Sequence, residues 1–169
     1  MVLAFASCSR KTPWSDSSGA LHLVLPAGWK PYEDATTSIR EHPRHGKLTL
    51  LGAKFHRGGD LMAGFVVLSI MKDGVLRNDS AAESRDPIRL AELGGRFVFG
   101  LGVARGSCEL VEVPTRTLAR CREDSARSPG FVYGFMVGDK AGFAALGSIG
   151  NPAELRADVE QLLGSIQDL

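Results

Sequence analysis

The stretch between Cys108 and Cys121 can fold back on itself as a β-hairpin with complementary side chains in one register. With Pro114-Thr115 at the turn, the facing pairs are Cys108 with Cys121, Glu109 with Arg120, Leu110 with Ala119, and Val111 with Leu118. Sulfur then faces sulfur, opposite charges face each other, and apolar side chains face apolar ones. Facing Cα atoms at a non-hydrogen-bonded position lie about 4.5 Å apart, which suits a disulfide. The sequence therefore predicts two antiparallel strands joined by a Cys108–Cys121 bridge; the alternative is two reduced, packed thiols.

Further strands are predicted where apolar residues alternate with polar ones or form short runs between turn residues. Leu21, Leu23 and Leu25 give the clearest alternation, and Pro26-Ala27-Gly28 ends that strand. The other predicted strands cover residues 47–55, 61–71, 96–101, 131–137 and 142–149.

Two helical regions carry recognisable start signals. Ser80 with Glu83 resembles a capping box, and Asp86-Pro87 has the cap residue and first-turn proline of a second start. That helix is expected to end at Gly94-Gly95. Near the C-terminus, Asn151 precedes a proline, and apolar residues then recur at helical spacing as far as Ile166. The C-terminal helix is amphipathic and is expected to lie on a sheet.

The first eight residues, Met-Val-Leu-Ala-Phe-Ala-Ser-Cys, are typical of the end of a lipoprotein signal. Cys8 is then the candidate lipidation site. The polar residues 9–19 are expected to form a flexible linker, so that residues 1–19 are signal remnant and linker and residues 20–169 form one domain. A bridged Cys108–Cys121 pair leaves Cys8 for the lipid, and both features indicate a membrane-anchored protein facing the periplasm or exterior. The alternative is an incidental cysteine in a cytoplasmic protein.

The net charge is +1, so the overall field gives no reason to expect a nucleic-acid partner. No nucleotide-binding loop or nucleophile elbow is present in the sequence, and no catalytic residue or cofactor is predicted. His42, His45 and His56 are weak candidates for a metal site. Arg44 and Pro43, which stand between the first two histidines, fit an exposed loop better.

Both ends of the domain resemble a known family. Leu-Val-Leu-Pro-Ala-Gly-Trp-Lys at 23–30 is similar to the opening of PsbP-like domains, and the strand, Asn-Pro break and final helix at 147–166 are similar to their close. This family includes DcrB-like lipoproteins and EagR-type chaperones. The resemblance implies an α+β sandwich, an antiparallel β-sheet with helices packed on its faces, that binds other proteins and has no catalytic residues to carry over.

We therefore expect a non-catalytic envelope lipoprotein that acts as an accessory, assembly or protein-binding module, held at the membrane through lipid at Cys8. One alternative is a cytoplasmic chaperone of the EagR type, with free thiols, that binds a secreted effector. Another is a metal-binding protein that uses the three histidines.

Overall fold

The computed structural model describes residues 10–58, 62–124 and 130–168. Cys8 lies outside these residues, so lipidation stays a prediction. The described strands form a two-stranded sheet, β1 (Thr12–Ser15) with β2 (His22–Leu25), and a seven-stranded antiparallel sheet of order β3-β4-β5-β9-β8-β7-β6. The large sheet comprises β3 (Trp29–His42), β4 (Gly46–Gly58), β5 (Met62–Met71), β6 (Glu109–Val113), β7 (Arg116–Arg122), β8 (Phe131–Val137) and β9 (Lys140–Ser148).

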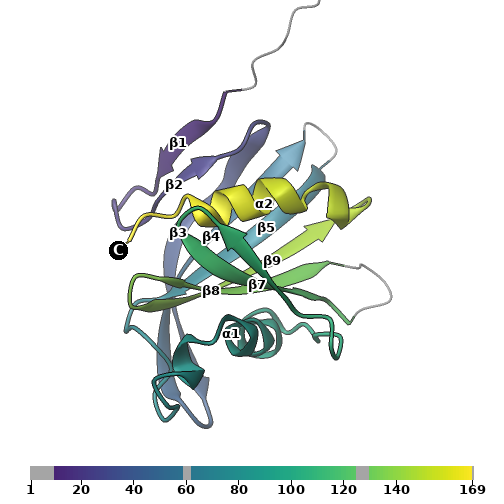
Figure 1. The fold of residues 1–169 in the computed structure, drawn as a ribbon. Coiled ribbons are helices and arrows are strands. Elements are labelled where there is room, and N and C mark those ends of the chain that lie inside the picture. Colours follow the sequence, from purple (N-terminus) through teal and green to yellow (C-terminus); the bar gives the residue numbers. More distant parts are fainter. Residues whose placement is uncertain (1–9, 59–61, 125–129, 169) are drawn as a thin grey trace, which may run out of the picture.

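Helices cover opposite faces of the large sheet (Figure 1). Helix α2 (Arg156–Gly164) and the β1–β2 hairpin lie on one face, over a core that includes Phe55, Tyr133 and Leu162. Helix α1 (Pro87–Leu93) lies on the other face, beside a second core that includes Leu90 and Phe143. The fold is the α+β arrangement that the sequence predicts. Among the described residues, no helix is both long and apolar enough to cross a membrane.

The hairpin of β6 and β7 has the predicted register. Glu109 pairs with Arg120, Leu110 with Ala119, and the two strands meet at the Pro114-Thr115 turn. Cys108 and Cys121 form a disulfide, with their Cα atoms 4.0 Å apart. The pairing of sulfurs, charges and apolar side chains was therefore sufficient to fix this register.

The flexible linker predicted over residues 9–19 is wrong from Thr12 onward. Strand β1 pairs with β2, and the Trp14 ring packs edge-on against Phe55 with centroids 5.0 Å apart. The side chain of Asp16 accepts a hydrogen bond from the Leu21 amide at 2.6 Å and fixes the turn between the two strands. Burial by itself would raise the pKa of Asp16. Hydrogen bonds from Ser18 and Leu21 together outweigh burial, so the pKa of Asp16 lies below its ordinary value. The polar composition of residues 9–19 gave no indication of this hairpin, because only a few of its side chains, such as Trp14, pack on the core.

The strand predicted over 96–101 is also wrong. Residues Gly94–Phe99 continue α1 as a π-helical turn, and the chain leaves it at Gly100, whose φ is +68°. Gly94 is a packing residue here, because a Cβ at this position would lie 2.7 Å from the Phe143 ring. The α-helix ends at Leu93 with Gly94 as its C-cap, as predicted, and Gly94 also lets the helical segment approach the sheet closely.

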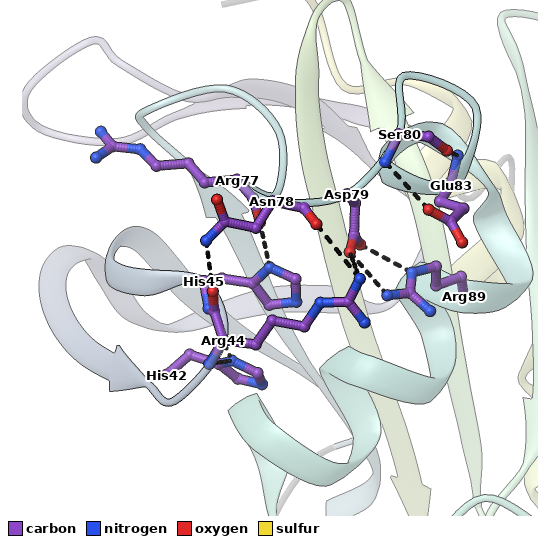
Figure 2. A network of polar contacts seen from close by, with 9 residues as sticks. All are labelled: His42, Arg44, His45, Arg77, Asn78, Asp79, Ser80, Glu83 and Arg89. Atoms are coloured by element: carbon purple, nitrogen blue, oxygen red, sulfur yellow. Dashed lines mark hydrogen bonds and ion pairs between the residues drawn. The ribbon is translucent and has the colours of Figure 1, made fainter.

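Strand β3 was missed by the sequence analysis. It is an edge strand whose residues are mostly exposed, so its sequence lacks the apolar alternation of a covered strand. At its far end it turns through residues 43–45 into β4, and this turn contacts Arg77 and Asn78 of the loop that precedes α1 (Figure 2).

Candidate functional site

A cavity of about 360 Å³ lies between the β3–β4 turn and the helical segment that runs from α1 into the π-helical turn. We call it the basic cavity. Its lining consists of His42, Arg44, His45, Arg89, Glu92, Leu93, Arg96, Phe97 and Val103. Three guanidinium groups therefore border one small space. Two of the three predicted metal-site histidines border the same space.

The His42 ring is held in one orientation by its surroundings. Its Nδ1 accepts hydrogen bonds from the backbone amides of Arg44, at 3.1 Å, and His45, at 3.2 Å. The ring lies against that of His45, with centroids 4.5 Å apart, and edge-on to Phe97. Because Nδ1 must present a lone pair to the two amides, neutral His42 carries its proton on Nε2.

His45 is held in the opposite tautomer. Its side chain is buried, and its Nδ1 is hydrogen-bonded to the carbonyl oxygen of Arg77. A carbonyl oxygen accepts only, so Nδ1 of His45 carries a proton. This bond joins the β3–β4 turn to the loop that leads into α1 (Figure 2).

Asp79 is the charged centre of the network in Figure 2. Its side chain has no exposed surface, and Arg89 donates to both carboxylate oxygens, at 2.8 and 2.9 Å. Arg44 adds a third contact at 3.1 Å. Hydrogen bonds from Arg89 lower the pKa of Asp79 by more than burial raises it, so the group remains ionised at neutral pH.

Local capping signals hold this loop in place. Ser80 and Glu83 form the predicted capping box, in which each backbone amide donates to the other residue's side chain. The Asp86 side chain accepts from the Ile88 amide and caps α1, as predicted. Asn78, at a φ of +64°, donates through Nδ2 to the Arg44 carbonyl at 2.7 Å. The β3–β4 turn, the loop and α1 are thus fixed to one another.

The pKa of His42 lies below its ordinary value. Burial is the main cause, and the neighbouring His45 and Arg44 lower the pKa further, against the opposing effect of Asp79. His42 is therefore neutral at pH 7, with its Nε2 proton available as a donor.

The third predicted metal ligand, His56, does not join this pair. His56 pairs with Lys30 near one end of the β3–β4 hairpin, whereas His42 pairs with Gly46 at the other. In residues 10–58, 62–124 and 130–168, no group of three or more histidine, cysteine or acidic residues is placed to hold a metal ion. The three-histidine site is therefore wrong: the residues are close in sequence, but a long strand separates them in space.

The sequence analysis missed Arg44, Asp79 and Arg89 as a cluster. The capping box next to Asp79 identified a structured loop, and Asp86 identified the start of the helix that carries Arg89. Nothing in the spacing indicated that a turn 35 positions before Asp79 would meet this loop, because that contact depends on the length of the β3–β4 hairpin.

No family model and no curated protein matches the sequence. Among solved structures, the chain is similar to the solution structure of cyanobacterial PsbP (CyanoP) from Synechocystis. The identity is 8%, the TM-score is 0.54, and the match covers 100% of this chain and 98% of that chain. At this identity the likeness establishes the fold alone. The chain thus has the PsbP-like fold that its two ends predict.

Proposed function

We propose that this protein is a non-catalytic accessory or assembly factor that binds another protein in the bacterial cell envelope. In this proposal the chain acts in an oxidising compartment and is held at the membrane through lipid on Cys8. The remaining two cysteines are then structural.

The observation on which the proposal rests is the Cys108–Cys121 disulfide. Disulfides persist in oxidising compartments and are rare in the cytosol, where thiols are kept reduced. Cys121 is fully buried and the bridge closes the hairpin at one edge of the large sheet. In the loop-entropy model, closing so short a loop contributes about 3 kcal/mol to stability.

The open edges of the sheet support the protein-binding part of the proposal. Strands β3 and β6 each have one partner in the sheet, so each leaves one edge unpaired among the described residues. Such an edge can pair with a strand of another chain. Tyr32 and Ile39 of β3, 60% and 59% exposed, add apolar surface beside that edge.

The compartment is tested on the full chain in bacterial cells lysed directly into a denaturing thiol-alkylating reagent. We expect Cys108 and Cys121 to escape alkylation unless a reductant is added first, and we expect Cys121 to react without reductant in the variant Cys108→Ser. Alkylation of both cysteines without reductant would overturn the proposal and favour a cytoplasmic chaperone.

The anchor has a separate test. Radiolabelled palmitate should enter the full chain, and the variant Cys8→Ser should take up none. Equal labelling of the two proteins would refute lipidation at Cys8. The compartment would still be decided by the alkylation experiment.

A further inference from the structure

Arg44 and Arg89 keep hydrogen-bond donors that Asp79 does not use. An arginine side chain has five N–H donors. Arg89 meets Asp79 through Nε and Nη2, and Arg44 directs Nη2 to Asp79 and to the Asn78 carbonyl. The Nη1 groups of both arginines are outside these contacts. Asp79 therefore orients two guanidinium groups without saturating them.

Arg96 is the third cation of the basic cavity. It is exposed, it stands on the π-helical turn, and it forms no hydrogen bond or ion pair with any residue that the structure describes. A cation at the border of a cavity, beside two arginines held in place by a buried carboxylate, is arranged to receive negative charge from outside the chain.

The charges around the cavity do not cancel. Arg44, Arg89 and Arg96 contribute three positive charges, while Glu92 on the lining and Asp79 behind it contribute two negative ones. The balance of these five side chains is one positive charge. Phe97, Leu93 and Val103 give the rest of the lining an apolar character.

We propose that the basic cavity binds a small organic anion, a carboxylate or phosphate group attached to a compact apolar body. The anionic group lies among Arg44, Arg89 and Arg96, where the Nε2 proton of His42 provides one more donor. The apolar body lies against Phe97, Leu93 and Val103. A volume of about 360 Å³ is in the range of small-ligand sites. This inference goes beyond the proposed function and does not depend on the compartment.

The test is a titration of the full chain, labelled with ¹⁵N, with phenyl phosphate, benzoate, inorganic phosphate and benzyl alcohol. We expect either phenyl phosphate or benzoate to cause saturable shifts of amide signals, and we expect these shifts to be confined to residues around the cavity. Inorganic phosphate lacks the apolar body and benzyl alcohol lacks the charge, so each should bind about tenfold more weakly or not at all. Which aromatic anion binds more tightly distinguishes a phosphate ligand from a carboxylate one.

Three variants separate a built site from general charge attraction. Arg96→Ala should weaken binding about tenfold, since a charge-assisted hydrogen bond is lost. Arg122→Ala removes another exposed arginine with the same change in net charge and should leave the affinity within about twofold, because Arg122 lies outside the cavity. Arg96→Lys should lie between Arg96→Ala and the unmodified protein, because it keeps the charge and loses the planar fork.

The inference is overturned if neither aromatic anion gives saturable shifts below about 10 mM. Equal weakening by Arg96→Ala and Arg122→Ala would also overturn it, and so would shifts that map away from the cavity. Because Arg96 is exposed and unpaired among the described residues, its replacement is expected to leave the fold intact, and the ¹⁵N spectrum of each variant shows this directly.

Discussion

Arg89 of α1 donates one hydrogen bond to each carboxylate oxygen of Asp79, and so fixes the helix to the loop that precedes it. The Asp79 side chain has no exposed surface and lies behind the cavity lining, where it holds Arg89 in place. We expect Asp79→Asn to lower the free energy of unfolding by about 2 kcal/mol, since hydrogen bonds to charged groups contribute 1.5–3 kcal/mol. Urea unfolding measures the change. Asp73→Asn is the control, since Asp73 is exposed and should tolerate the same substitution; equal losses in both variants would contradict this role of Asp79.

The same carboxylate predicts how stability depends on pH. The pKa of Asp79 is lowered in the folded protein, chiefly by the hydrogen bonds from Arg89. The ionised Asp79 side chain therefore stabilises the folded protein fully above the unfolded-state pKa of about 3.9. This stabilisation is lost as pH falls toward the lower pKa of the folded state. The difference in unfolding free energy between the unmodified protein and Asp79→Asn should narrow below about pH 4. A difference that stays constant or widens there would show that ionised Asp79 does not provide the stabilisation.

Gly134 of β8 sets the separation between the sheet and α1. A Cβ at this position would lie 2.2 Å from the Pro87 carbonyl oxygen and from the Ala91 nitrogen, both of which belong to the helix backbone. Backbone cannot rotate aside as a side chain can, so we expect Gly134→Ala to lower the free energy of unfolding by about 3 kcal/mol. In the matched control, Gly150→Ala, the added Cβ meets nothing within 4 Å. Thermal unfolding that shifts equally in both variants would refute the close approach.

The sequence could predict those features that depend on residues close together along the chain, and it could not predict those that depend on distant residues. The register of the β6–β7 hairpin and the caps at Ser80 and Asp86 were predictable, because each depends on residues close together in sequence. Strand β3 was not, because an exposed edge strand has no apolar face to reveal it. The π-helical turn was missed since Gly94 signals a helix end locally but is used for contact with Phe143.

The basic cavity was even less accessible to sequence analysis. His42 and His45 were recognised as a pair, and the metal hypothesis assigned them to a cation site. The structure surrounds them with Arg44, Arg89 and Arg96, which favour an anion instead. Only the folded hairpin brings Arg44 to Asp79, so no local pattern indicated the sign of the charge that the site would accept.

Tyr133 has a buried hydroxyl group without a hydrogen-bond partner among the described residues. Burial raises the pKa of this group, so the hydroxyl keeps its proton at neutral pH. An unsatisfied buried hydroxyl is unfavourable, and we therefore expect Tyr133→Phe to raise the free energy of unfolding by about 1 kcal/mol. Tyr32→Phe is the control, because that side chain is 60% exposed and should change stability little. A clear loss of stability on Tyr133→Phe, measured by urea unfolding, would mean that the hydroxyl has a partner.

The role of the basic cavity as an anion site is tested most directly by following the His42 ring by proton NMR as a function of pH, with and without phenyl phosphate or benzoate. The ring packs against His45 and Phe97, its pKa is influenced by the charges of Arg44 and Asp79, and it shares the cavity with Arg89, Arg96 and Glu92. In the free protein, the pKa of His42 should lie below its ordinary value of about 6.5. The anion that binds should raise this pKa, because a bound negative charge favours the protonated ring. A His42 pKa that neither anion changes would contradict the account.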